Sequence, residues 1–149
     1  MNIFVTVGST RYDSLFYAIE KALNDNHNAI FQIADGEYTH PTITTIRFVK
    51  NINEYYENAD VVITHAGAGS VYTLLEMGKK VIVVQNTERV DAHQQDLVRF
   101  VEEEKYGLGC YDVSQIAEKV KQIEHFEPIA YVKNEFNKAK EICEALQLI

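Results

Sequence analysis

Short runs rich in Val and Ile alternate regularly with longer segments of helical periodicity along this chain. We expect strands at residues 2–7, 29–34, 44–49, 61–64 and 80–84, with a short edge strand at 108–111. We expect helices at residues 13–24, 53–57, 71–77, 91–105, 114–123 and 129–146. Strands of this kind that alternate with helices are typical of a parallel sheet covered on both faces, so the sequence predicts an α/β fold.

The length fits one domain. The chain has 149 residues, of which 46% are apolar, and we treat residues 1–149 as a single domain with its own core. The two cysteines, Cys110 and Cys143, lack the spacing of a metal site or a redox motif. We expect both to be small buried hydrophobic residues rather than functional thiols.

The charge excludes some classes of partner. A formal net charge of -8 argues against nucleic acid as a ligand and against a polybasic membrane anchor. The first residues run directly into a predicted strand and do not resemble a signal peptide. The longest apolar runs, such as residues 81–84, are too short to span a membrane. We therefore expect a cytoplasmic protein, with any membrane role supplied by a partner or a lipid-linked substrate.

Ligands of open parallel sheets bind at the carboxyl ends of the strands, which points to residues 8–11, 65–70 and 85–95. The loop from His65 to Ser70 has the strongest signal, because Gly67 and Gly69 let a ligand approach the backbone and Ser70 is placed to cap the next helix. A helix N-terminus beside such a loop is an anion site, and a diphosphate is the obvious anion. A tight turn with a serine cap is an equally good explanation of this loop alone.

Two familiar cofactor patterns are missing. A dinucleotide fingerprint follows the first strand, whereas this glycine pattern follows the fourth, so an NAD enzyme is disfavoured. The chain has no Asp-x-Asp pair to hold a divalent metal on a diphosphate, and residues 35–37 read as a surface turn. We expect neither a cofactor nor a metal site.

A second signal opens the predicted helix at residues 91–105. Asp91 as N-cap with Gln94 three residues later is nearly a capping box, which is a purely structural explanation. That explanation does not account for His93, Gln94 and Gln95 together at the mouth of the same cleft. Amide side chains both donate and accept hydrogen bonds, which suits sugar hydroxyls.

Residues 59–107 as a whole resemble the C-terminal domain of family 28 glycosyltransferases. The resemblance rests on three stretches and on the N-terminal residues 4–10: the run ADVVITHAGAGS at 59–70, EMGKK at 76–80, and D-x-H-Q-Q at 91–95. It implies a GT-B fold, in which two Rossmann-like domains face each other and the C-terminal one binds the donor nucleotide. One domain is half of such an enzyme, so the resemblance implies a membrane-associated partner subunit that binds a lipid-linked acceptor. Bacterial members of the subgroup act in capsule and exopolysaccharide synthesis, and their donors are UDP-sugars.

The resemblance also implies roles for single residues. The loop residues Gly67, Ala68, Gly69 and Ser70 would hold the UDP diphosphate, and His65 would stand beside it as the catalytic hydrogen-bond donor. The remaining donor-site residues would contact the sugar or phosphates or line the wall facing the partner: Gly8, Ser9, Thr10, Thr73, His93, Gln94 and Gln95. The general base is expected on the partner.

One position departs from the family pattern. Thr73 stands where members usually have Asp or Glu to bind the ribose hydroxyls, and Glu76 one turn later is a possible substitute. This departure keeps a second interpretation open, in which the chain is a non-catalytic accessory subunit that stabilises a partner glycosyltransferase. A third is a lone α/β domain that binds another anion. The stripe Val132, Phe136, Ala139 and Ile142 is expected to pack on the chain's own sheet, or alternatively on the partner.

Overall fold

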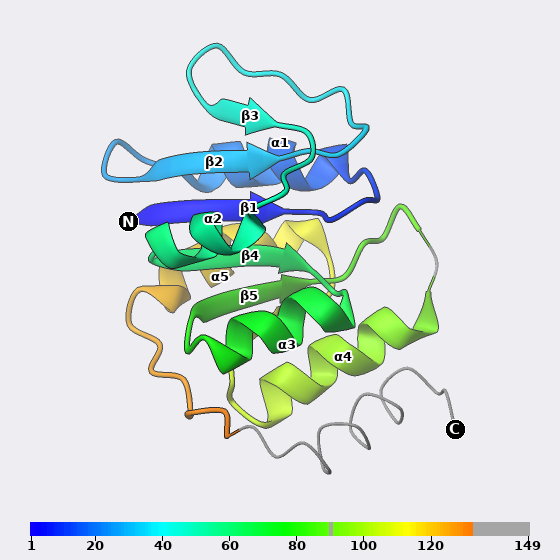
Figure 1. Cartoon of the computed structure of the whole chain (residues 1–149), viewed down its shortest axis with the longest axis vertical. Coiled ribbons are helices and arrows are strands. Elements are labelled where there is room, and N and C mark those ends of the chain that lie inside the picture. The colour runs from blue at the N-terminus through cyan, green and yellow to red at the C-terminus, as the bar shows by residue number, and fades with distance from the viewer. Residues whose placement is uncertain (90, 133–149) are drawn as a thin grey trace.

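The computed structural model describes residues 1–89 and 91–132, which form one parallel sheet between two layers of helices (Figure 1). The strands are β1 (Asn2–Thr6), β2 (Asn28–Gln32), β3 (Thr44–Ile46), β4 (Val61–His65), β5 (Lys80–Val84) and β6 (Leu108–Cys110). The helices are α1 (Asp13–Ala22), α2 (Ile52–Asn58), α3 (Ala68–Glu76), α4 (Ala92–Glu103) and α5 (Ile116–Ile123), with a 3-10 turn η1 (Val113–Gln115) before α5. The α/β prediction is confirmed.

The sheet is Rossmann-like, with strand order β3-β2-β1-β4-β5-β6. All five strand pairs are parallel. The order runs outward in one direction from β1 and in the other from β4, so the neighbouring pair β1 and β4 forms the switch point of the topology. Ligands of such sheets bind in the crevice outside the carboxyl ends at this point.

Each face of the sheet has its own core. Helices α1 and α5 lie behind the sheet in Figure 1 and cover alternate strand residues such as Val5, Ile63 and Ile82. Helices α2, α3 and α4 lie in front and cover the other set, including Phe4, Val62 and Val83. Because consecutive side chains of a strand point to opposite faces, the central strands are mostly apolar, and their buried polar residues Thr6, Gln32 and Thr64 lie at or near the carboxyl ends.

Some predicted boundaries were wrong. Strands β2 and β3 are shorter than expected, although the Ile33 and Ala34 amides still donate to the Ile46 and Arg47 carbonyls beyond the strand ends. The expected helix at 114–123 begins as a 3-10 turn. Residues 129–132 are not helical, and the rest of the expected last helix lies outside the described residues.

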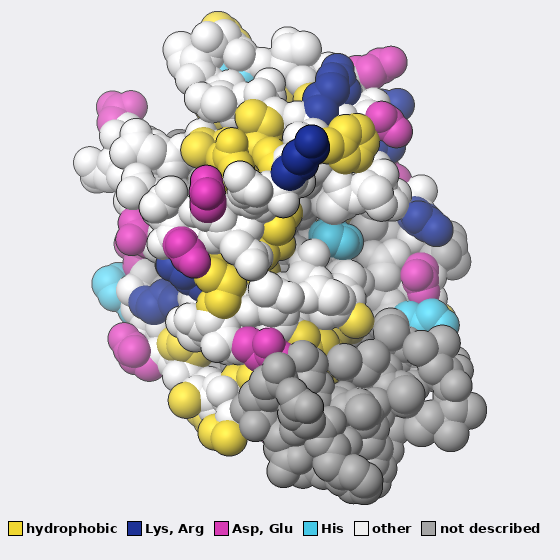
Figure 2. All heavy atoms as spheres, viewed as in Figure 1, with side chains coloured by type: hydrophobic (Ala, Val, Ile, Leu, Met, Phe, Trp, Pro, Cys, Tyr) yellow, Lys and Arg dark blue, Asp and Glu magenta, His cyan; other side chains and the backbone are white. Residues whose placement is uncertain are grey.

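The described part of the chain has mixed surface charge. Acidic and basic side chains are interspersed on the face seen in Figure 2, with no single sign covering it. Among the described residues no helix is long and apolar enough to cross a membrane. Cys110 is buried as expected, and burial raises the pKa of its thiol to about 11. Cys143 lies outside the described residues.

Candidate functional site

The loops after β1 and β4 meet around the imidazole of His65. A Cβ atom at Gly8 would lie 2.8 Å from His65 Cε1, and one at Gly67 would lie 2.4 Å from His65 Nε2. Both distances are shorter than any side chain tolerates, so the ring fills the space that these two glycines leave open. Gly8 also has a φ of +65°, which disfavours other residues. The two glycines therefore make room for the histidine rather than for a ligand.

Enclosure keeps this imidazole neutral. Burial lowers the pKa of His65, and a hydrogen bond to the backbone of Thr6 opposes that shift only in part. His65 Nδ1 also lies 3.5 Å from the hydroxyl oxygen of Thr64. A neutral ring has a single N–H group, which the bond to the Thr6 backbone uses, and it brings no positive charge to the site at neutral pH.

Gln32, at the end of β2, holds the Gly8 loop through hydrogen bonds to its backbone. Its side-chain oxygen accepts hydrogen bonds from the Thr6 hydroxyl (2.6 Å), the Val7 amide (3.0 Å) and the Gly8 amide (3.1 Å). Its side-chain nitrogen donates to the carbonyls of Gly8 (2.8 Å) and Arg47 (2.5 Å). With five partners and only 2% exposure, this side chain fixes the turn that presses against the His65 ring.

The N-terminus of α3 is open. The helix begins at Ala68, and Gly67 is its N-cap, so the expectation that Ser70 caps a helix starting at residue 71 was wrong. The Val71 amide closes the first turn on the Gly67 carbonyl at 3.0 Å. Because a glycine cap has no side chain, it cannot cover the first N–H groups, and they stay available to an anion. The Ser70 side chain instead makes a hydrogen bond with the buried Tyr56 hydroxyl.

The N-terminus of α4 is capped by the carboxylate of the residue before it. Asp91 is the N-cap, as expected, and accepts a hydrogen bond from the His93 amide at 2.9 Å. Gln94 turns inward, where its oxygen accepts from the Asn86 amide (2.7 Å) and its nitrogen donates to the Arg89 carbonyl (3.2 Å). Gln94 therefore holds the β5–α4 loop in this structure and is only 8% exposed.

The other two members of this motif are more accessible. His93 is half-buried, and its Nδ1 has no hydrogen-bond partner among the residues that the structure describes. Gln95 is exposed. Gln95 is therefore open to a ligand at the start of α4, whereas the unpartnered His93 Nδ1 is buried.

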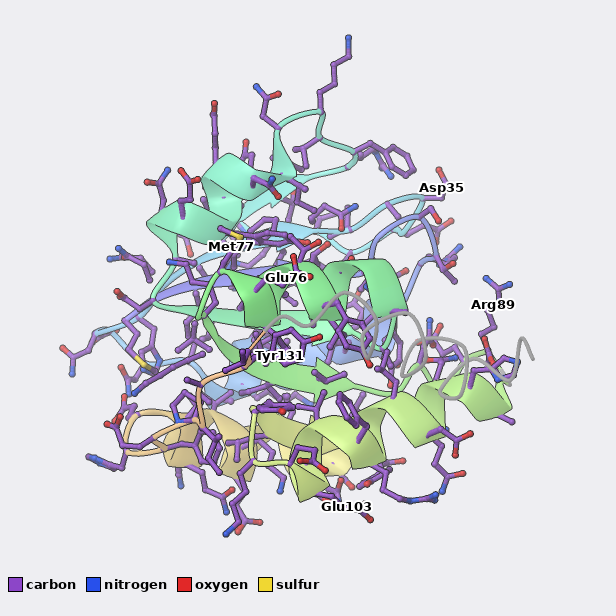
Figure 3. All side chains as sticks on the ribbon, turned by 60° about the horizontal axis from the view of Figure 1, so that its bottom comes forward. Asp35, Glu76, Met77, Arg89, Glu103 and Tyr131 are labelled. Atoms are coloured by element: carbon purple, nitrogen blue, oxygen red, sulfur yellow. The ribbon has the colours of Figure 1, made fainter. Side chains whose placement is uncertain are left out.

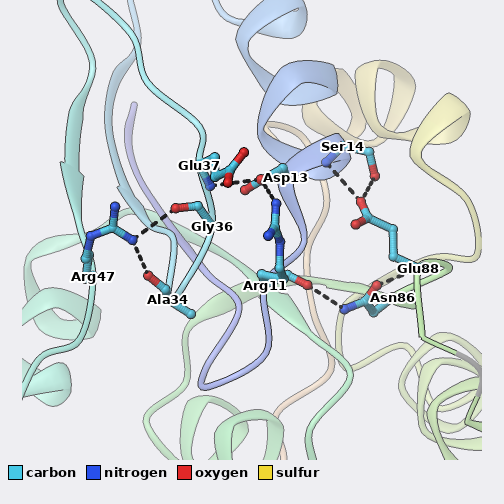
Figure 4. A network of polar contacts seen from close by, with 9 residues as sticks. All are labelled: Arg11, Asp13, Ser14, Ala34, Gly36, Glu37, Arg47, Asn86 and Glu88. Atoms are coloured by element: carbon cyan, nitrogen blue, oxygen red, sulfur yellow. Dashed lines mark hydrogen bonds and ion pairs between the residues drawn. The ribbon is translucent and has the colours of Figure 1, made fainter.

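The β5–α4 loop is tied to the β1–α1 loop (Figure 4). The Tyr12 hydroxyl donates to the Gln85 carbonyl at 2.9 Å, and the Asn86 amide side chain donates to the Arg11 carbonyl at 3.3 Å. Ser14 donates to the Glu88 carboxylate through both its amide and its hydroxyl. Because β4 lies between β1 and β5, these contacts span the carboxyl end of the strand that leads to His65.

One contact of this kind involves a charged side chain. Arg89 donates from a guanidinium nitrogen to the Thr10 hydroxyl at 3.0 Å. Thr10 is half-buried and Ser9, beside it, is exposed. Figure 3 shows Arg89 projecting at the same edge of the molecule as Asp35, which follows β2.

Thr73 and Glu76 lie at different distances from the glycine loop. Thr73 is half-buried in the middle of α3, whereas Glu76 is the exposed last residue of the helix (Figure 3). At 1.5 Å per residue, Glu76 lies about 12 Å along the axis from the first residue of α3. Thr73 is therefore the nearer of the two to the open N-terminus.

A cavity of about 770 Å³ lies at the opposite, amino-terminal edge of the sheet, beside Asn2, Asn28 and Thr44. The topology of the sheet places ligand binding at the carboxyl edge instead. The converging loops, the open helix N-terminus and the enclosed His65 all lie at the carboxyl edge, which we take as the candidate site.

A profile of the Glycosyltransferase family 28 C-terminal domain matches residues 2–149. The chain belongs to this family. It is 32% identical over 122 residues to the human UDP-N-acetylglucosamine transferase subunit ALG13, a match that covers 72% of this chain and 11% of the human protein. It is 30% identical over 102 residues to a Cytophaga hutchinsonii N-acetylglucosamine transferase acting on a pyrophosphoryl-undecaprenol substrate, covering 62% of this chain and 28% of that protein.

Solved structures share the fold of this family 28 domain. MurG of Acinetobacter baumannii superposes with a TM-score of 0.66 at 19% identity, covering 100% of this chain and 52% of MurG. A solution structure of ALG13 superposes with a TM-score of 0.65 at 17% identity, covering 98% of this chain and 96% of that one. These neighbours confirm a Rossmann-like domain equivalent to one half of a GT-B glycosyltransferase.

Sequence reasoning missed three residues of the site, Gln32, Tyr12 and Tyr56, and it gave no role to Arg89, which lies within the expected range 85–95. Only Gln32 left a readable signal, because it is an amide inside the otherwise apolar run AIFQIA. A polar residue in a buried strand needs partners, and here they belong to the site. The other three act across long sequence separations that the local pattern does not contain.

Proposed function

We propose that this domain binds the UDP-sugar donor of a two-component glycosyltransferase whose acceptor is bound by a membrane-associated partner subunit. The observation that carries the proposal is the open N-terminus of α3, capped by Gly67 beside His65 at the switch point of a family 28 domain. The ALG13 relatives are named as subunits of a UDP-N-acetylglucosamine transferase, which supports both the donor class and the partner. On this proposal the chain works at the cytoplasmic face of a membrane and is brought there by the partner.

The reaction would be displacement at the anomeric carbon. The acceptor hydroxyl attacks, the bond from the sugar to the diphosphate breaks, and UDP leaves. Preorganised N–H donors at the start of α3 stabilise the charge that develops on the diphosphate, and the neutral His65 ring lies beside them. The general base that takes the proton from the acceptor is proposed to lie on the partner.

The transferred sugar is proposed to be a hexose or an N-acetylhexosamine attached to a lipid-linked acceptor. Both named groups of relatives use N-acetylglucosamine, so UDP-N-acetylglucosamine is the first donor to test. UDP-galactose, UDP-glucose and UDP-glucuronate are the comparisons. A role in exopolysaccharide or capsule synthesis is part of the same proposal.

Calorimetric titration of the purified chain with UDP and these four UDP-sugars tests the proposal. Gly69→Val is the informative variant, because a Cβ at Gly69 meets nothing within 4 Å in the protein and the new side chain occupies the space open to a ligand. We expect UDP binding by the wild type and its loss in this variant without loss of folding. Binding that is equal in both would remove the loop from the donor site.

Ser70 needs a matched pair of variants, because its hydroxyl already contacts Tyr56. Ser70→Ala and Tyr56→Phe both remove that hydrogen bond, but only Ser70→Ala also removes a hydroxyl from the first turn of α3. A larger loss of UDP affinity in Ser70→Ala supports direct contact, and equal losses assign Ser70 a structural role.

Thr73 supports a second candidate function, an accessory subunit that stabilises a partner glycosyltransferase and binds no donor. A hydroxyl cannot accept two hydrogen bonds from a ribose as a carboxylate does. Thr73→Glu separates the two functions. A gain in UDP affinity would mean that this is a donor site weakened at the ribose, and no binding in either form would favour the accessory role.

A further inference from the structure

Among the described residues, His65 and the start of α3 bring little full positive charge to the candidate donor site. A nucleoside diphosphate carries close to two negative charges on its phosphates, whereas a helix N-terminus supplies roughly half a positive charge. Burial lowers the pKa of His65, so its ring is neutral at pH 7. Among the described residues, the neighbouring loops carry arginines that can supply a cation for the diphosphate.

Three arginines on the loops at this edge differ in the hydrogen bonds and ion pairs that they form. Arg11 forms an ion pair with Asp13 at 2.7 Å, which neutralises its charge. Arg47 donates from one nitrogen to the carbonyls of Ala34 and Gly36, both at 3.0 Å, and so fixes the loop after β2 (Figure 4). Arg89 donates only to the Thr10 hydroxyl among the described residues, and it is exposed. Most of its guanidinium donors are open to a ligand.

The position of Arg89 is set by the topology. Its bond to Thr10 joins the loop after β5 to the loop after β1, and β4 lies between those strands. The guanidinium is therefore held across the carboxyl end of β4, the strand that ends at His65 and leads to the open N-terminus of α3. Gln94 holds the Arg89 carbonyl at 3.2 Å, so the backbone that carries this side chain is anchored as well.

We propose that Arg89, held against Thr10 across the end of β4, binds the diphosphate of the nucleotide-sugar donor. This inference rests on the proposed function, and it assigns the residue that supplies the positive charge. A guanidinium binds phosphate oxygens through two parallel N–H donors. Arg89 is exposed and uses one nitrogen for Thr10, so its other N–H groups can form such a pair. The Thr10 hydroxyl then acts as a positioning group for the side chain.

Titration of the full chain with UDP, UMP and uridine tests this role. We expect Arg89→Ala to weaken UDP binding by roughly 10-fold to 100-fold, the range for a charged hydrogen bond, and uridine binding by less than about twofold. UMP should show an intermediate loss. Raising the salt concentration should weaken UDP binding by the wild type more than binding by the variant, because the lost contact is ionic.

Two further variants separate charge from structure. Arg89→Gln keeps a donor for Thr10 but removes the charge, so we expect it to bind UDP as weakly as Arg89→Ala. Arg99→Ala is the matched control, since Arg99 is also an exposed arginine and lies within α4, 3.5 Å from Asp96. It should leave UDP affinity unchanged.

The possible results distinguish this inference from the proposed function. UDP affinity that survives in Arg89→Gln, or an equal loss of UDP and uridine, overturns the role of Arg89 while the donor site stands. A wild type that binds neither UDP nor uridine at millimolar concentration overturns the donor site and the role of Arg89 with it. Loss in Arg99→Ala equal to that in Arg89→Ala would mean a general charge effect and would also overturn the assignment.

Discussion

Replacing Gln32 by methionine is expected to destabilise the domain strongly, although methionine has nearly the same volume. Of the five hydrogen bonds that Gln32 makes, those with the Thr6 hydroxyl and the Val7 amide are fully buried. The bonds at Gly8 and Arg47 are partly buried, so water can replace them. Two buried groups without partners, at about 1–3 kcal/mol each, give a loss of about 4 kcal/mol in the free energy of unfolding.

Gln94→Met is the matched control, because Gln94 is also a buried glutamine. It makes one fully buried hydrogen bond, with the Asn86 amide, and one partly buried bond. The same reasoning gives a loss of about 2 kcal/mol. For a domain of this size the two variants should lower the melting temperature by roughly 12 °C and 6 °C respectively.

Urea denaturation followed by far-UV circular dichroism measures both losses, and the absence of tryptophan makes fluorescence the poorer probe. The dependence of the unfolding free energy on urea should stay unchanged, because the variants do not alter the surface exposed on unfolding. A Gln32→Met loss below about 1 kcal/mol, or one no larger than that of Gln94→Met, would refute the reasoning from buried partners.

Three more predictions follow from the geometry of the loops. Gly67→Ala places a Cβ 2.4 Å from the His65 ring, which Gly8 confines on its other side, so we expect the free energy of unfolding to fall by about 1–3 kcal/mol. Gly69→Ala has open space around its Cβ and should raise the free energy of unfolding by about 0.5–1 kcal/mol. Urea unfolding compares the two variants, and equal effects would contradict the packing argument. Because burial lowers the pKa of His65, the unfolded chain takes up the proton first as the pH falls, so the free energy of unfolding should decrease below about pH 6.5. His65→Gln should remove this part of the pH dependence. Parallel plots of unfolding free energy against pH for the two proteins would show the assignment to be wrong. Asp91→Ala removes the N-cap of α4 and should cost about 1 kcal/mol, measured by thermal unfolding, and an unchanged midpoint would mean that the cap contributes nothing.

The role expected for the glycine loop shows where a local pattern misleads. The sequence gives Ser70 as the better helix cap by residue preference, yet α3 begins three residues earlier, after Gly67. Packing decides this, because Gly67 must lie against the His65 ring and Ser70 bonds to Tyr56 on α2. The consequence for function is that the helix presents open N–H groups instead of a serine cap.

The sequence alone determined the kind of elements and the kind of site. Runs of β-branched residues and helical periodicity are local, so they identified β1, β4, β5 and the parallel α/β fold. The motif at residues 59–70 also identified the family, as the match over residues 2–149 confirms.

Only the tertiary structure decided which residues meet. The order of strands depends on long-range packing, and it places β1 beside β4, so that Gly8 and Gly67 enclose one imidazole although they lie far apart in the chain. The same order carries Arg89 across the end of β4 to Thr10 and turns Gln94 inward, away from the position that its motif suggested. Local preference fixes how a segment folds, whereas the burial of two sheet faces at once fixes which loops converge, and the candidate site is built from that convergence.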